Sequence, residues 1–204
     1  HQTFYFPGCA DDPISLGISN EKLQGLKFGV ITVGNPGHIR EFVEIAYGAG
    51  VDLVWSLRND PHAFPQSLVH LLVEKCKVLV MNHFESRQLL KSLGQASLQQ
   101  IREWGAKIII ETFGSAGSKV YFGDEIYNIP AVKPRAFVDP TGAGDAFVGG
   151  FLCGLIKNFP VEVAARIGAV VSSFVIEAWG CQSSLPNWMN VVQRYQEAFG
   201  KGLT

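Results

Sequence analysis

Four short runs rich in valine and isoleucine divide the first half of the chain at nearly regular intervals. They cover residues 27–33, 51–57, 77–82 and 106–112. Each run is apolar at consecutive positions, which is typical of strands buried on both faces of a parallel sheet. Between the runs lie segments with helical spacing of apolar residues: 36–50, 64–76 and two successive segments, FESRQLLKSLG and SLQQIREWG, over 84–105. This alternation of strands and helices predicts an α/β fold with a mostly parallel sheet and helices on both faces.

The pattern changes after residue 112. Apolar and polar positions alternate over 119–131, with a Gly-Asp turn at 123–124. We therefore expect a hairpin here and a sheet that becomes antiparallel. Helical patterns follow at 144–158, 161–180 and 186–199. No internal repeat or low-complexity linker interrupts the sequence, so we expect one domain over residues 1–204.

Composition narrows the class of ligand. Hydrophobic residues make up 47% and charged residues 17% of the 204 residues, as in a globular protein with much buried surface. The net charge of −1 and the lack of a basic run give no electrostatic footprint for nucleic acid or an anionic membrane. The four cysteines are scattered without a C-x-x-C pair, which favours reduced thiols. No apolar run reaches the roughly 20 residues of a membrane-spanning helix. We therefore expect a cytoplasmic protein with a small-molecule ligand.

The segment FVDPTGAGDAFVGGF, residues 137–151, contains the most specific chemistry in the sequence. Gly142 and Gly144 lack Cβ atoms, so several backbone N–H groups of this turn can point at one place. A helix that begins here adds unpaired N–H donors and the positive end of its dipole. The turn is therefore suited to a phosphate group.

Asp145 follows the turn directly, and two interpretations of it stay open. It can be a carboxylate that stabilises a helix N-terminus. It can also be a base that takes a proton from a hydroxyl group attacking phosphorus. A helix N-terminus weakens such a base, but phosphoryl transfer depends more on positioning and charge stabilisation than on full deprotonation.

The sequence D-P-T-G-A-G-D-A-F followed by G-G-F resembles the C-terminal signature of the ribokinase-like, or PfkB, carbohydrate kinase family. The resemblance extends over nearly the whole chain. It implies a three-layer α/β/α fold, with Asp145 as the catalytic base. It also implies that the backbone N–H groups of Gly142, Ala143 and Gly144 stabilise the transferred γ-phosphoryl group of ATP.

The same resemblance implies a monovalent cation, usually potassium, behind the phosphate-binding turn. Asp139 and Thr141 match positions that bind this cation in many members of the family. The segment VIEAWGCQSS, residues 175–184, resembles the rest of the cation loop. The matching ligands are Ser184 and the backbone oxygens of Val175, Ala178 and Gly180.

Asn82 and Glu85 form an N-x-x-E pattern at the end of a predicted strand. From the residues alone, Asn82 caps the next helix and Glu85 completes a capping box. The resemblance implies that the pair also organises magnesium, with Glu85 acting through water, around the nucleotide phosphates. Both interpretations use the same helix N-terminus, so they do not exclude each other.

Thr112, Gly114 and Gly117 form a T-x-G-x-x-G pattern. A dinucleotide-binding fingerprint would open a helix, whereas this segment precedes another predicted strand. A tight turn between strands is the simplest interpretation. The resemblance places Thr112 and Gly114 near the nucleotide phosphates and lets the backbone at Gly117 approach the nucleotide.

Two further groups stay without an assigned role. Arg58 lies in WSLRNDP, where the family often has D-x-N-x-R, but Trp55 replaces the leading aspartate. Gly168, Ala169 and Ser172 share one helical face and suit either an adenine pocket or helix packing.

The N-terminal part of the family, with its acceptor-binding aspartate and β lid, is not recognisable; the chain is expected to begin within or just after the lid, at QTFYFPGCA. The sequence therefore predicts part of an ATP-dependent kinase that phosphorylates a hydroxymethyl group of a sugar, with magnesium and, in many relatives, potassium. The alternatives are a nucleoside kinase, because the chain's end resembles bacterial adenosine-type kinases, and a non-catalytic nucleotide-binding member. A homodimer stays open.

Overall fold

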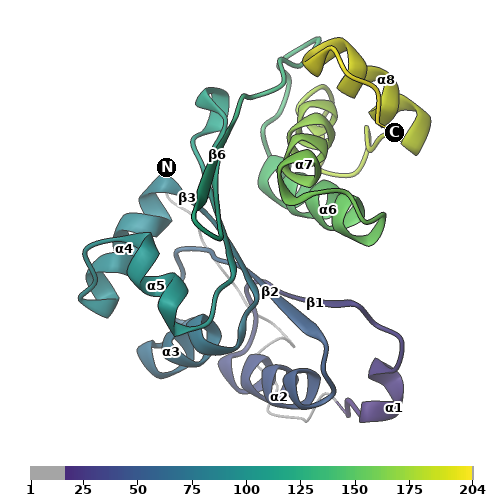
Figure 1. Ribbon diagram of the computed structural model, residues 1–204. Helices are drawn as coiled ribbons and strands as arrows, with labels where there is room; N and C mark the ends of the chain where they lie inside the picture. Colours follow the sequence, from purple (N-terminus) through teal and green to yellow (C-terminus); the bar gives the residue numbers. More distant parts are fainter. Residues whose placement is uncertain (1–16, 204) are drawn as a thin grey trace. The chain divides into compact units, whose positions relative to one another are not determined.

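The computed structural model describes residues 17–203, and the chain divides into two compact units. The first unit is His1–Lys107 and the second unit is Ile108–Thr204 (Figure 1). The expected lid remnant, QTFYFPGCA, and Cys9 lie outside the described residues.

The first unit contains three parallel strands, β1 (Phe28–Ile31), β2 (Asp52–Ser56) and β3 (Val78–Asn82). The central strand β2 pairs with both others, and Val54 lies opposite Val30 on one side and Val78 on the other. Four of the five residues of β2 and of β3 are buried. The continuous apolar runs therefore predicted parallel, buried strands correctly.

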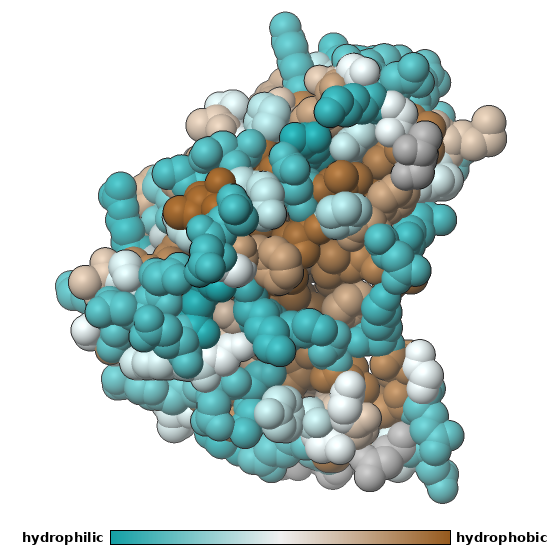
Figure 2. All heavy atoms as spheres, viewed as in Figure 1, coloured by the Kyte–Doolittle hydropathy of each residue, from teal (hydrophilic) through white to brown (hydrophobic). Residues whose placement is uncertain are grey.

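Helices follow each strand of the first unit. These are α2 (Pro36–Gly48), α3 (Gln66–Lys75), α4 (His83–Leu93) and α5 (Leu98–Trp104), preceded by the short α1 (Asn20–Leu23). Asn35 caps α2, because its side chain accepts the N–H groups of Gly37 and His38. The two successive helices predicted over 84–105 are confirmed, and Gly94 at φ +63° ends α4. Hydrophilic residues cover the visible outer side of α4 and α5 (Figure 2).

The second unit begins with three antiparallel strands, β4 (Ile108–Thr112), β5 (Ser118–Phe122) and β6 (Glu125–Ile129). A short 3-10 turn, Gly114–Ala116, joins the first two strands. Gly123 at φ +57° lies in the turn between β5 and β6, as the Gly-Asp pair predicted. The predicted change from parallel to antiparallel pairing is confirmed.

Three helices complete the second unit: α6 (Ala143–Ile156), α7 (Val161–Val175) and α8 (Trp188–Phe199). Glycines bring α6 and α7 close together, side by side in Figure 1. A Cβ atom at Gly150 would lie 3.0 Å from the Cα of Gly168, and one at Gly154 would lie 2.7 Å from the Cα of Ala164. The glycine spacing of α6 therefore serves helix packing. Gly168 has the same role, because its Cβ would lie 2.7 Å from the carbonyl oxygen of Phe147.

The helical prediction over 161–180 is wrong in its last five residues, because α7 ends at Val175. Donors outside the helix take the carbonyl groups that a longer helix would use. The carbonyl of Ile176 accepts the N–H groups of Val138 and Asp139, and the hydroxyl of Ser184 donates to the carbonyl of Phe174. These contacts with distant residues turn the chain into a loop.

No helix in the described part of the chain is long and apolar enough to cross a membrane. Cys76, Cys153 and Cys181 are free thiols. Burial raises the pKa of the Cys76 thiol, which makes this cysteine an unreactive core residue.

Candidate active site

The N-terminus of α6 has the geometry expected of the phosphate-binding turn. Gly142 is the N-cap residue at φ +80°, and no side chain caps this end of the helix. A Cβ atom at Gly142 would lie 2.3 Å from the Cβ of Cys181. Both the left-handed backbone and the close contact therefore require glycine. A helix N-terminus without a side-chain cap suits an anion, although the Ala143 N–H donates to the carbonyl of Pro140 at 3.1 Å.

Asp145 lies exposed in the first turn of α6, as predicted. It lines a cavity of about 590 Å³, which we call the second cavity, together with Gly142 and Cys181. An exposed carboxylate beside uncapped amides can accept a proton from a hydroxyl group that approaches the same turn.

The other side of the turn opens into a cavity of about 400 Å³, which we call the first cavity. The predicted nucleotide residues Thr112, Gly114 and Gly117 line it together with Ala143 and Gly144 of the turn. The structure thus brings the T-x-G-x-x-G pattern and the phosphate-binding turn to one cavity within the second unit. Apolar side chains supply much of its wall, including Val132, Phe137, Phe147 and Ile176. A mostly apolar cavity with a few polar groups in its wall suits a nucleotide.

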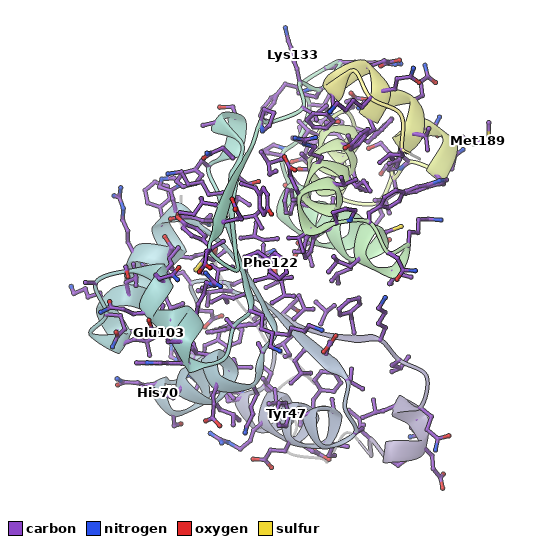
Figure 3. All side chains as sticks on the ribbon, viewed as in Figure 1. Tyr47, His70, Glu103, Phe122, Lys133 and Met189 are labelled. Carbon is purple, nitrogen blue, oxygen red and sulfur yellow. The ribbon has the colours of Figure 1, made fainter. Side chains whose placement is uncertain are left out.

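Helix α7 contributes small residues to the wall of the first cavity. Ala169, Ser172 and Ser173 line the first cavity. Ala169 and Ser172 were correctly grouped on one helical face, and their small size was the available signal. Lys133 also belongs to the lining, although its side chain extends away from the second unit's ribbon (Figure 3).

The two glycines of the T-x-G-x-x-G pattern serve different structural needs. Gly114 is at φ +59° and a Cβ atom there would meet nothing within 4 Å, so only its backbone conformation favours glycine. A Cβ atom at Gly117 would lie 2.2 Å from the carbonyl oxygen of Ile129. Gly117 is therefore required by the close approach of the chain after β6.

Asp139 connects the phosphate-binding turn to the loop after α7. Its carboxylate accepts the N–H of Thr141 at 2.9 Å and the N–H of Gly180 at 3.4 Å. Hydrogen bonds from the Thr141 side chain, and then from the Thr141 and Gly180 backbones, hold the pKa of Asp139 below its ordinary value, against a small opposing effect of burial. Three of the six predicted cation ligands are thus in direct contact.

A second contact lies at the other end of the same loop. The hydroxyl of Ser184 donates to the carbonyl of Phe174 at 2.7 Å and to that of Val175 at 3.5 Å. Ala178 lies between Val175 and Gly180 in the sequence, and it is half-buried. Asp139 and the loop 175–184 therefore present carboxylate, hydroxyl and carbonyl oxygens, which are the ligand type of hard cations.

Asn82 and Glu85 form a complete capping box at the N-terminus of α4 in the first unit. The Asn82 side chain accepts the N–H groups of Phe84 and Glu85 at 2.9 Å, and the Glu85 carboxylate accepts the Asn82 N–H at 2.7 Å. Glu85 is 7% exposed and lines a cavity of about 240 Å³ together with Arg58. The structural interpretation of N-x-x-E is confirmed, and its magnesium role stays a prediction.

Comparison with protein families identifies a match to the pfkB family carbohydrate kinase over residues 28–188. A nucleoside kinase of Methanocaldococcus jannaschii is 32% identical over 167 residues, which are 82% of this chain and 54% of that protein. The chain thus spans about half the length of this curated relative.

Solved structures agree with the sequence match. A Burkholderia thailandensis nucleoside kinase in complex with ADP-inosine has a TM-score of 0.81 and 25% identity, and the match covers 91% of this chain and 57% of that chain. A ribokinase of Thermotoga maritima has a TM-score of 0.77 at 22% identity over 94% of this chain and 64% of that chain, which shows a shared fold. The predicted ribokinase-like α/β fold is therefore confirmed.

Proposed function

This chain belongs to the pfkB family of carbohydrate kinases, and we propose from this premise that its protein is an ATP-dependent kinase that phosphorylates a hydroxymethyl group of a nucleoside. The observation that carries the proposal is the uncapped turn at Gly142, with Asp145 in the first turn of the same helix and a mostly apolar cavity beside it. This arrangement supplies a phosphate site, a base and a nucleotide site within one unit. The predicted sugar acceptor becomes the second candidate.

The N–H groups of Gly142 and Gly144 bind the oxygens of the transferred phosphoryl group, and Ala143 supports the turn through its own N–H, which donates to the carbonyl of Pro140 at 3.1 Å. Asp145 orients the acceptor hydroxyl and accepts its proton. Because the transition state of phosphoryl transfer is loose, the protein contributes mainly position and charge stabilisation. ATP supplies the transferred group. Thr112, Gly114 and Gly117 hold the rest of the nucleotide in the first cavity, where the apolar wall excludes water from the nucleobase of ATP.

The chain's oxygen atoms fit the two expected cations. The carboxylate of Glu85 beside Asn82 suits magnesium held through water, because magnesium keeps several of its own water ligands. Asp139, Thr141 and Ser184, with the carbonyls of Val175, Ala178 and Gly180, would hold a monovalent cation. Magnesium neutralises phosphate charge when bound. Asp139 also holds the Thr141 amide in place, so this residue orders the turn even without a cation.

The relatives favour a nucleoside over a sugar. One similar protein is named as a nucleoside kinase, and a solved relative is a complex with ADP-inosine. A non-catalytic nucleotide-binding protein is the third candidate. The presence of both Asp145 and the uncapped turn argues against it, because nucleotide binding alone does not need a base. A cytoplasmic location and a homodimer stay predictions.

The test is acceptor-dependent release of ADP by the full-length protein with magnesium and potassium. A panel of purine and pyrimidine nucleosides, pentoses and hexoses separates the candidates. The proposal predicts turnover with at least one nucleoside, and with nucleosides at a higher kcat/KM than with sugars. Turnover with sugars alone would establish the second candidate. Nucleotide binding without any acceptor-dependent release would establish the third.

A further inference from the structure

Arg194 is a buried charged residue on the inner face of α8. It lies between Val191 and Tyr195 on the face that packs against α7, and it is only 4% exposed. A buried guanidinium group is tolerated when its charge and its N–H donors are paired. The mechanism above does not use this residue, so its partners indicate what it does.

Arg194 makes a bidentate contact with the carboxylate of Glu177. One nitrogen donates to Oε1 at 2.8 Å and the other donates to Oε2 at 3.2 Å. The central carbon of the guanidinium group lies 3.3 Å from the centroid of the Phe174 ring. A two-pronged contact stacked on an aromatic ring fixes both the place and the orientation of the carboxylate.

Glu177 also contacts the segment that precedes the phosphate-binding turn. Its Oε1 also accepts the backbone N–H of Arg135 at 2.6 Å. The preceding residue, Ile176, accepts the N–H groups of Val138 at 2.9 Å and Asp139 at 3.2 Å. The segments 135–139 and 176–180 are therefore held against each other at both ends.

Asp139 then carries the connection into the turn. Its carboxylate accepts the N–H groups of Thr141 and Gly180, and Gly142 follows directly. A second branch runs from Arg194 to the hydroxyl of Ser173 at 3.1 Å, and Ser173 lines the first cavity. Hydrogen bonds thus join one arginine on α8 to the phosphate-binding turn and to the cavity beside it.

We propose that Arg194 is a positioning residue for the phosphate-binding turn, and that it acts through Glu177 and Asp139. This inference rests on the proposed function for its kinetic consequence, but its structural consequence can be measured without turnover. When the pair is broken, segment 176–180 loses its contact with α8. The orientation of the backbone N–H groups from Gly142 to Asp145 is then no longer fixed. The nucleotide cavity keeps its apolar wall.

The test compares Arg194→Ala and Glu177→Gln with Arg166→Ala in the full-length protein. Arg166 is a matched control, because it pairs with Glu162 on α7 and lies 5.4 Å from the Phe199 ring of α8. Arg194→Lys keeps the charge without the two-pronged contact, and it replaces the alanine variant if that variant does not fold.

The first measurement is hydrogen exchange, without ligand, of the amides of Val138, Asp139, Thr141 and Ala143, which donate hydrogen bonds in the folded protein. We expect exchange about tenfold faster in Arg194→Ala and in Glu177→Gln, and unchanged exchange in Arg166→Ala, since couplings through packed networks are of this order. Exchange in the Arg194 variant equal to that in the Arg166 control would overturn the proposal. This outcome is decisive even if the wild-type protein phosphorylates nothing, in which case the proposed function alone fails.

The second measurement is the division of the effect between kcat and KM. We expect Arg194→Ala to lower kcat about tenfold, because the N–H groups of the phosphate-binding turn lose their orientation. The KM for ATP should rise less than threefold, because the nucleotide cavity remains. In a variant that already carries Asp139→Asn, the Arg194 substitution should lower kcat by less than about twofold, since both act on one path. Independent, multiplicative losses would contradict a path through Asp139.

Discussion

The N-termini of α4 and α6 carry the same kind of residue in opposite arrangements. Both have a carboxylate in the first turn, Glu85 in α4 and Asp145 in α6. In α4 the N-cap Asn82 accepts two backbone N–H groups, and Glu85 accepts a third. In α6 the N-cap is Gly142, and no side chain caps the turn.

The N-terminus of α4 has its backbone N–H groups paired by side chains of its own first turn. The N-terminus of α6 has no side-chain cap and is open to a ligand. A capping box completes the hydrogen bonds of a helix N-terminus and stabilises the fold. A glycine N-cap gives up that stabilisation and leaves room for an anion. We therefore propose that the transferred phosphoryl group binds at α6, whereas the capping box of α4 stabilises the first unit.

The largest effect should come from Asp145→Asn. Loss of the base should lower kcat by about 100- to 10,000-fold, the usual contribution of general base catalysis, while ATP affinity stays nearly unchanged. Steady-state kinetics and calorimetric titration with ATP measure the two quantities. Asp124→Asn, an exposed aspartate in the turn after β5, is the control and should keep wild-type turnover. If Asp145→Asn kept most of the turnover, Asp145 would not be the base.

Gly142→Ala should break the turn itself. Its Cβ would overlap that of Cys181, and φ +80° is unfavourable for alanine, so we expect a stability loss of about 1–3 kcal/mol. Displaced amides should also lower kcat about 100-fold. The control is Gly149→Ala on the same helix, where a Cβ meets nothing within 4 Å. That variant should be stabilised by about 0.5–1 kcal/mol in urea unfolding. Equal stability of the two variants would refute the steric argument.

Asn82→Ala should show that α4 is capped by its own residues. Removal of the cap acceptor should cost about 1 kcal/mol in the free energy of unfolding, measured by urea denaturation. Asn82→Asp keeps an acceptor and should lose little. A variant Asn82→Ala as stable as the wild type would mean that the capping box contributes nothing.

The smallest expected effect is that of acidic pH on the order of the turn held by Asp139. The pKa of Asp139 is lowered in the folded protein, so its contribution to the order of the turn is present above the ordinary pKa of 3.8 and is lost only as pH falls through the lowered folded pKa. The exchange rate of the Thr141 amide, corrected for intrinsic pH dependence, should be flat from pH 8 to about 5. Asp139→Asn should exchange faster and lack the acid step. A wild-type transition between pH 5 and 7 would contradict this assignment.

Local patterns predicted most of the fold, because local interactions decide those elements. The buried runs around Val54 and Val78 predicted parallel strands, and Asn35 and Asn82 predicted helix starts. The end of α7 was mispredicted, since donors from Val138, Asp139 and Ser184 take the carbonyl groups there. Such donors lie far away in the sequence and leave no local signal.

The candidate site divides in the same way. Gly142 and Asp145 were identified by a long, specific pattern, and the structure gives the steric reason for the glycine. Ser173 was missed because no local pattern shows which face of α7 meets the first cavity. Arg194 had a weak signal, a charge on the apolar face of an amphipathic helix, but its partner Glu177 is 17 positions away.

The most direct test of the contrast between α4 and α6 is hydrogen exchange of the full-length protein with and without magnesium and a non-hydrolysable ATP analogue. At saturating analogue, we predict slower exchange at the amides of Gly144 and Asp145 and little change at those of Phe84 and Glu85. Unchanged exchange at Gly144 and Asp145 would contradict the account, because the uncapped turn would then not be the phosphate site.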